Sequence, residues 1–305
     1  MIPCSHIIRR SLTTEKVSIN SVFFQDRIQK LLKDITRFEE SKIFGRRVFK
    51  KLRSPKFVFM TDAQLQRAKE DAYHNAKALL QMPPVMEANT ESPSVLARDE
   101  ELVGYTKFKI MFVDITPGHT DRTRLMSVRE PDGTLRYPTH EERSRLNHMF
   151  YPIESRSIDP PKMFEEKHLS DLLKRRQYVY ALNRACIQFE PDDPRYVDLT
   201  SKIYNYIDDK QDYDELRSTR HFGPMSLYLA YNKRADNLML EMLSKGFIED
   251  AAKLVKIYNT CHRIDYDDGD DDLTLLKNYA KSNTAKSHNI ELALQRLVGN
   301  KPNKE

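Results

Sequence analysis

Glycine is scarce in this chain and widely spaced. The 305 residues include 8 Gly against 15 Pro, and no two glycines lie within ten residues of each other. So few glycines favour helices joined by stiff connectors over turns and phosphate loops that depend on Gly. The spacing also excludes the G-x-G-x-x-G, P-loop and G-x-S-x-G motifs. Nucleotide-binding and hydrolase interpretations therefore lose their main support.

Two stretches near the N-terminus have the period of amphipathic helices. From Ile28, apolar residues recur at i+3, i+4 and i+7 with charges between them. Thr61 and Gln64 then have capping-box spacing ahead of a helix that Pro83 and Pro84 end. A narrow stripe on this second helix is typical of core packing and consists of Leu65, Ala68, Ala72, Ala76 and Leu79.

After Pro160 the pattern is helical throughout. Two successive helices are expected to bury one face each, formed by Tyr178, Leu182, Ala185 and Phe189 in the first and by Tyr196, Leu199, Ile203 and Ile207 in the second. Gly246 is placed as the left-handed residue that ends the first helix of a later helical hairpin. Because there is no Trp and no fixed period near about 34 residues, irregular stacked helix pairs are favoured over a repeat array.

Strands are indicated only in the middle of the chain. In "YTKFKIMFVDI" Phe108, Ile110 and Phe112 alternate with more polar residues, which predicts a strand with one apolar face. Two short strands, "RLMSVRE" and "TLRY", flank Pro131-Asp132-Gly133, a strong hairpin turn signal. A helix follows at once, since Thr139 and Glu142 have capping-box spacing.

The predicted fold is mostly α and α+β overall. A small central antiparallel β-hairpin region precedes a C-terminal bundle of irregular stacked helical hairpins. The expected segments are a mitochondrial presequence at 1–20, a basic helical arm at 21–56, a central α+β region at 57–160 and a helical domain at 161–305.

Positive charge is concentrated near the N-terminus. Residues 1–56 hold 14 Lys or Arg against 5 Asp or Glu, so with a whole-chain net charge of +5 the rest carries −4. The best nucleic-acid candidate is a cluster without acids, formed by Arg46, Arg47, Lys50, Lys51, Arg53 and Lys56. The alternatives are a flexible solubilising tail and a basic helix that faces water.

Targeting and redox signals agree with a mitochondrial protein. The first fifteen residues contain Arg9 and Arg10, several hydroxyl residues and no acid before Glu15, as in a matrix presequence. The three cysteines are far apart and indicate a reduced compartment rather than a disulfide scaffold. No apolar run is long enough for a membrane span.

No catalytic residue, cofactor or metal site is predicted. His140-Glu141 lacks the second histidine of a zinc-protease helix, because position 144 is Ser, so His140 is expected to face solvent. The acidic stretch Asp265–Asp272 does not have the ligand spacing of a calcium loop and is interpreted as a solvated loop.

The charged residues of the hairpin raise the question of a binding loop. Asp132 is accounted for by the turn, and Glu142 by the helix cap. The remaining charged residues, Arg129, Glu130 and Arg136, are expected to be exposed and to grip a partner. A second basic cluster, in "LRSTRHFG", consists of Arg217, Arg220 and His221, for which RNA contact and buried ion pairing are both open.

An ordered set of motifs carries a family resemblance. The set is "FVFMTDAQL", "MPPVMEA", "VREPDGTLR" with "EERSRL", "QFEPDD", "LRSTRHFG" and "EDAAKLVKIY". Together they resemble the mitochondrial small ribosomal subunit protein S twenty-two family, from about Phe57 to Leu297, whereas the first 56 residues match it poorly.

The resemblance implies a structural protein of the mitochondrial ribosome in the matrix, without catalytic activity. Its implied partners are the small-subunit mitochondrial ribosomal RNA and other small-subunit mitochondrial ribosomal proteins, with no small-molecule substrate. An alternative is a free matrix adaptor of helical hairpins that binds proteins and nucleic acid transiently, and a third is an enzyme with an unfamiliar site.

Overall fold

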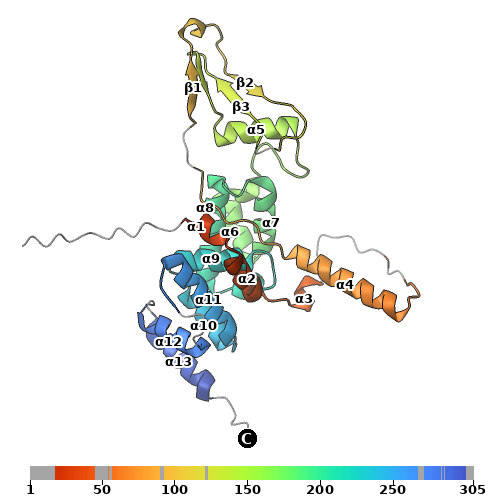
Figure 1. Ribbon diagram of the computed structural model, residues 1–305, viewed down its shortest axis with the longest axis vertical. Helices are drawn as coiled ribbons and strands as arrows, with labels where there is room; N and C mark the ends of the chain where they lie inside the picture. Colours follow the sequence, from red (N-terminus) through yellow and green to blue (C-terminus); the bar gives the residue numbers. More distant parts are fainter. Residues whose placement is uncertain are drawn as a thin grey trace, which may run out of the picture. The chain divides into compact units, whose positions relative to one another are not determined.

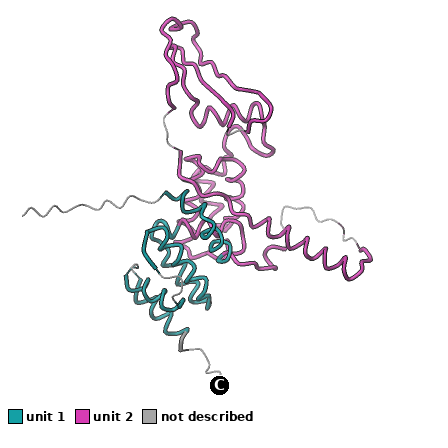
Figure 2. Tube along the Cα trace, viewed as in Figure 1, with its two compact units in different colours: residues 1–35, 229–305 teal, residues 36–228 magenta. Residues whose placement is uncertain are grey.

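The helices and strands of the chain divide into two units. The structure, a computed structural model, describes residues 18–44, 54, 57–89, 93–120, 123–266, 271–282, 284 and 286–299. Unit 1 combines Met1–Ile35 with Leu229–Glu305, and unit 2 is Thr36–Tyr228 (Figure 2). Each unit has an apolar core of its own.

Unit 1 is helical in its described residues. Its helices are α1 (Ile19–Phe23), α2 (Asp26–Thr36, whose last residue opens unit 2), α10 (Asp236–Ser244), α11 (Ile248–His262), α12 (Asp272–Ser282) and α13 (Ser287–Gly299). Helix α11 packs against α1, α10 and α12, and α13 packs against α10 and α12. Of the apolar positions of α2 that the periodicity singled out, Ile28, Leu32 and Ile35 are fully buried and Leu31 is half-buried. The first part of the expected basic arm is therefore packed helix rather than a free extension.

The turn between α10 and α11 has the geometry expected at a helix C-terminus. Gly246 has φ +77°, so the left-handed conformation that the sequence predicted there is confirmed. Its N–H donates to the carbonyl of Leu243 at 3.0 Å, and the Phe247 N–H donates to Met242 at 2.9 Å. These bonds satisfy carbonyls that the end of α10 would otherwise leave without partners.

Unit 2 contains helices before and after a small sheet. They are α3 (Glu40–Ile43), α4 (Asp62–Leu79), α5 (His140–Phe150), α6 (Glu166–Lys174), α7 (Tyr178–Gln188) and α8 (Pro194–Lys210), with 3₁₀ turns at Glu100–Leu102, Lys162–Phe164 and Tyr213–Glu215. Helix α9 (Phe222–Tyr231) begins in this unit and runs past its boundary. The apolar faces predicted for α7 and α8 are confirmed, because all eight of their residues are buried.

Helix α4 is capped as predicted but is not a core helix. Thr61 and Gln64 form both bonds of the capping box. Of the stripe expected in the core only Ala76 is buried, whereas Leu65 is 45% and Leu79 49% exposed, so that expectation is wrong. Helical periodicity shows which residues share a face, but it does not show whether another element covers that face.

The sheet has four antiparallel strands in the order β1-β4-β3-β2 (Figure 1). The strands are β1 (Val95–Arg98), β2 (Ile110–Val113), β3 (Met126–Arg129) and β4 (Thr134–Arg136). Strands β2, β3 and β4 confirm the prediction, whereas β1 was missed because its four residues show no alternation of apolar and polar side chains. The fold is mostly α with a small central antiparallel sheet, as predicted.

The β3–β4 turn is specified residue by residue. The Gly133 N–H donates to the Glu130 carbonyl at 3.1 Å, and the Glu130 N–H donates to Thr134 at 2.9 Å. Asp132 accepts from the Thr134 N–H at 2.9 Å. Gly133 has φ +80°, and a Cβ built there would lie 2.0 Å from the carbonyl oxygen of Asp99. Glycine is therefore required both by conformation and by a close neighbour.

Replacing Gly133 is expected to disrupt the hairpin more than an otherwise similar change. Gly133→Ala meets both the positive φ and the Asp99 backbone, so we expect a loss of more than about 3 kcal/mol. The control is Gly118→Ala, which has φ +97° but open space around its Cβ, and should lose only about 1 kcal/mol. Urea unfolding with hydrogen exchange of peptides covering β3 and β4 measures both, and equal losses would contradict the close-contact argument.

Candidate interaction site

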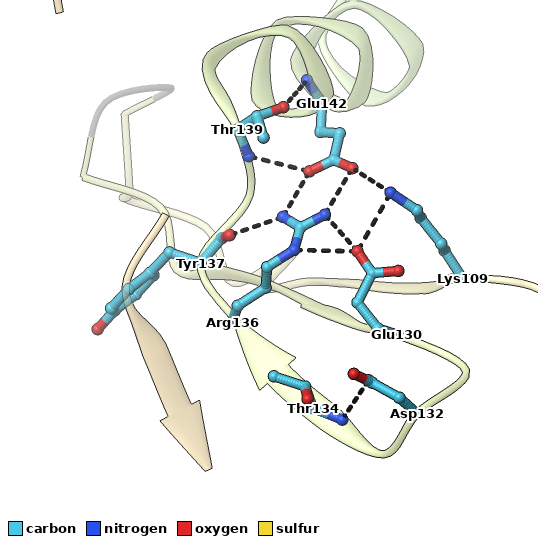
Figure 3. Close-up of polar contacts among 8 residues, drawn as sticks. All are labelled: Lys109, Glu130, Asp132, Thr134, Arg136, Tyr137, Thr139 and Glu142. Atoms are coloured by element: carbon cyan, nitrogen blue, oxygen red, sulfur yellow. Dashed lines mark hydrogen bonds and ion pairs between the residues drawn. The ribbon is translucent and has the colours of Figure 1, made fainter. Parts of the chain in front are cut away.

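The Arg136 guanidinium lies between two carboxylates, one on each side. Arg136 ends β4, Glu130 follows β3, and Glu142 lies in the first turn of α5 (Figure 3). Nη1 and Nη2 donate to the two oxygens of Glu142 at 2.8 and 2.9 Å. Nε and Nη2 donate to Oε1 of Glu130 at 3.0 and 2.6 Å. The ion pairs therefore connect the hairpin to the helix.

All five N–H donors of the Arg136 side chain are used. The fifth contact runs from Nη1 to the carbonyl of Tyr137 at 3.0 Å. Lys109, the residue before β2, adds a second cation, with its Nζ 3.1 Å from Glu130 and 3.4 Å from Glu142 (Figure 3). Since a guanidinium has five donors in a fixed plane, no other side chain could make this set of bonds.

Glu142 also starts the helix that it connects to the sheet. Its Oε2 accepts from the Thr139 N–H at 2.9 Å, and Thr139 Oγ1 accepts from the Glu142 N–H at 3.3 Å, which confirms the predicted capping box. The hydrogen bonds from Arg136, aided by the one from Thr139, lower the pKa of Glu142 to about 2. Hydrogen bonding to Glu142 raises the pKa of Arg136, and Glu130 raises that of Lys109.

The exposure predicted for the three hairpin charges is wrong, because Arg129, Glu130 and Arg136 are all half-buried. The Arg136 side chain is 11% exposed and that of Glu130 22%. The sequence interpretation assigned Glu142 only to the helix cap, whereas its carboxylate is also the main partner of Arg136. Arg136 and Glu130 bond to each other within the hairpin. Arg136 therefore has no free guanidinium donor with which to bind a partner.

Arg129 differs from Arg136 because it lies on the opposite face of the sheet. Neighbouring residues in a strand point to opposite faces, and Val128, which pairs with Arg136, is fully buried. Arg129 pairs with Ile110 and Leu135 in the register. It is half-buried, and its Nε has no hydrogen-bond partner within the described part of the chain.

The first turn of α5 also meets the start of α8. His140, expected at the solvent, is only 22% exposed, with ring nitrogens 3.7 Å from Asp192 and 3.8 Å from Asp193. Asp193 is the N-cap of α8 and accepts from the Arg195 N–H at 2.8 Å. This acid therefore has a structural role, which its sequence context as a Pro-Asp-Asp-Pro corner could have indicated.

The second basic cluster is largely internal. Arg217 is 4% exposed, with Nε 3.3 Å from Asp214 and its guanidinium 4.9 Å from the centre of the Phe222 ring. His221 is fully buried, and burial lowers its pKa to about 3. Of the two alternatives left open by the sequence, buried pairing describes Arg217, and the neutral, buried His221 offers no surface to a phosphate.

Arg220 and His221 share one acceptor that the sequence did not single out. Arg220 Nε donates to Oδ1 of Asn183 at 2.8 Å, and His221 Nε2 lies 3.0 Å from the same atom. Asn183 therefore joins α7 to the segment that leads into α9. No pattern in the sequence marks this residue, because 37 residues separate it from Arg220.

Arg124 is a further buried cation that sequence reasoning missed. It is 5% exposed, and its guanidinium lies 3.9 Å from the centre of the Tyr151 ring. Nη1 and Nη2 donate to the carbonyls of Asp114 and His119 at 2.6 and 2.9 Å. It thereby closes the connection between β2 and β3.

The strongest RNA-binding candidates lie outside the described residues. They are Arg46, Arg47, Lys50, Lys51, Arg53 and Lys56. In the described ranges, no three His, Cys, Asp or Glu side chains gather as metal ligands would. Within the same ranges, no helix has the length and apolar character that crossing a bilayer requires.

Comparison with known proteins gives consistent matches. A family model described as "Mitochondrial 28S ribosomal protein S22" matches residues 21–263, starting earlier than the motif-based resemblance. Small ribosomal subunit protein mS22 of Bos taurus is 34% identical over 299 residues, covering 96% of this chain and 83% of that protein. The Mus musculus mS22 is 35% identical over 298 residues, covering 94% and 83%. The matched range includes the hairpin network and α6 to α11.

Replacement of the two hairpin arginines should separate their roles. Arg136→Met leaves two carboxylates without their main partner, and we expect a loss of about 2 to 3 kcal/mol. Arg129→Met makes the same chemical change on the opposite face, where no ion pair is broken, and should stay within about 0.5 kcal/mol of wild type. Urea unfolding of the full chain measures both. If both variants lost the same free energy of unfolding, the structural role given to Arg136 would be refuted.

The hairpin should lose stability in acid. Because the pKa of Glu142 is lowered to about 2, its contribution is complete above its ordinary pKa of 4.5 and is lost as pH falls through about 2. Hydrogen exchange of peptides covering β3, β4 and α5 should accelerate across that window. Glu142→Gln removes this titration, so a variant with the same pH dependence as wild type would show that another group is responsible.

Proposed function

The chain belongs to the mitochondrial 28S ribosomal protein S22 family, and from this we propose that it is a structural component of the mitochondrial small ribosomal subunit. In this role it binds ribosomal RNA and neighbouring ribosomal proteins in the matrix and catalyses no reaction. The observation that carries the proposal is the match to small ribosomal subunit proteins along nearly the whole chain. The presequence-like N-terminus supports import into the matrix.

Contact with RNA is assigned to the basic cluster of residues 46–56. Its six cations are close enough together to neutralise several phosphates, and each phosphate contact releases counterions. Arg217 and His221 are not part of this surface, because both are buried. The helices after Pro160 are assigned mainly to protein contacts, in agreement with their acidic loops.

Exposed apolar side chains support the assignment of protein partners. The extended segment before α4 has Phe57 at 93% exposure, followed by Val58 at 66%, a fully exposed Phe59 and Met60 at 50%. Leu65 and Leu79 of α4 are also exposed. Four consecutive apolar residues in water are unfavourable for an isolated protein and typical of a surface that is covered in an assembly.

A free matrix adaptor remains the second candidate, because the same apolar surfaces would suit transient protein partners. The two candidates differ in what happens under salt. A ribosomal component stays with the small subunit, whereas an adaptor held by a few charges dissociates as salt rises.

Sedimentation of matrix extract tests the proposal. The full chain should migrate with the small subunit through high salt, and a free peak would refute it. Reversing Arg46, Arg47, Lys50 and Lys51 to Glu should reduce incorporation at least about tenfold. The matched control reverses four exposed lysines of α6 and α8, namely Lys167, Lys174, Lys202 and Lys210. Incorporation of the cluster variant at the wild-type level would contradict the RNA assignment, and the control shows what four charge reversals cost on helices that are assigned to protein contacts.

A further inference from the structure

The two faces of the sheet in unit 2 differ in burial along its central strand β3, whose pattern alternates between buried and half-buried residues. On the face that carries the Arg136 network, Met126 is 1% exposed and Val128 fully buried, whereas Met111 of the edge strand β2 is 42% exposed. On the opposite face Ile110 is 36%, Phe112 48% and Leu125 61% exposed. Strand β2 is exposed on both faces, so Ile110 and Phe112, the apolar face predicted from the sequence, lie at the surface rather than in a core.

The strand register brings together the residues on the face opposite Arg136. Ala97 pairs with Leu135, Leu135 with Arg129, and Arg129 with Ile110, so these four form a row across all four strands. Phe112 lies two residues along β2 from Ile110, on the same face. We use "bare face" for Ala97, Ile110, Phe112, Leu125, Ser127, Arg129 and Leu135.

A single cation lies in the middle of this apolar surface. Arg129 is flanked by Ile110 and Leu135, and its buried Nε–H lacks a hydrogen-bond partner among the residues that the structure describes. A donor that is shielded from water and not bonded is unfavourable. A partner that covers this face therefore gains by bringing an acceptor, and a carboxylate fits the planar donor edge of a guanidinium best.

We propose that the bare face is a docking surface for an amphipathic helix of a neighbouring protein, with an Asp or Glu of that helix against Arg129. The inference rests on the proposed function, since the neighbour is another protein of the same ribosomal subunit. The proposal names the surface that contacts this neighbour, which membership of the family does not specify.

The dimensions of the face suit a helix. Strands of three or four residues are about 10 to 13 Å long, and four of them span about 15 Å between the outer strands. A helix with side chains is about 10 to 12 Å wide, so three turns cover most of this area. The surface is smaller than a complete stable interface and is one part of a larger one.

The composition of the bare face favours protein over RNA. Surfaces that bind nucleic acid combine several cations with stacking rings. Among the seven residues here, Arg129 is the one cation, Phe112 the one ring and Ser127 the one hydroxyl residue, and the other four are aliphatic. Aliphatic side chains around a central arginine match the anatomy of protein interfaces, where Arg is enriched and apolar contacts exclude water.

Photo-crosslinking in assembled subunits tests the occupant. A benzoylphenylalanine replaces Phe112 in the full chain, with Tyr180 on α7, which is similarly exposed at 45%, as the control position. We expect Phe112 to crosslink to one helical peptide of a small-subunit protein, and Tyr180 not to crosslink to that peptide. A crosslink from Phe112 to ribosomal RNA, or none at all in assembled subunits, would overturn the proposal.

Charge exchange tests the role of Arg129. Arg129→Glu should lower incorporation about tenfold or more, whereas Arg129→Lys should retain part of it. Replacing the acid of the crosslinked peptide with Arg should restore incorporation of Arg129→Glu, and unchanged incorporation or failure of this rescue would contradict the ion pair. Hydrogen exchange of the hairpin in the isolated chain confirms that it remains folded.

The two proposals fail in different ways. A wild-type chain that does not enter the subunit refutes the proposed function and the docking surface together. Wild-type entry without the Phe112 crosslink refutes only the docking surface.

Discussion

The sheet region of unit 2 depends on the Arg136 guanidinium. Its five donors bond to the end of β3, the start of α5 and the backbone that joins β4 to α5. Glu142 contributes on both sides, because the carboxylate that caps the helix is also the one that pairs with the sheet. The position of the helix start and its attachment to the hairpin are therefore a single constraint. The pKa of Glu142 is lowered because the hydrogen bonds from Arg136 stabilise its ionised form.

The two faces of the sheet next to this network are not equally buried. Met126 and Val128, on the face of Arg136, are buried, whereas Ile110 and Phe112, on the opposite face, remain at the surface. A monomer gains nothing from an exposed apolar face, whereas a subunit of an assembly can bury it against a neighbour. The exposed side chains of α4 and of the segment before it have the same property. These surfaces agree with the family to which the chain belongs.

Buried cations connect other parts of unit 2. Arg124 closes a loop through two carbonyls and the Tyr151 ring, and Arg217 lies between Asp214 and Phe222. In each case the planar guanidinium provides both donors and a surface for ring contact. A basic residue in this sequence is therefore weak evidence for contact with RNA until its burial is known. The cluster at 46–56 differs, since it was assigned from its density of charge.

Local rules in the sequence determined most of the elements. The 3.6-residue period located α2, α7 and α8, capping boxes located α4 and α5, and the Pro-Asp-Gly turn located the hairpin, because these signals act over a few neighbouring residues. Only the tertiary structure decided which faces are covered. Arg136 and Arg129 look alike in "VREPDGTLR", and the first is internal because β4 and α5 bring Glu142 to it. Asn183 and Arg220 are 37 residues apart and meet only after folding. Burial and pairing depend on such distant neighbours, which local spacing does not encode.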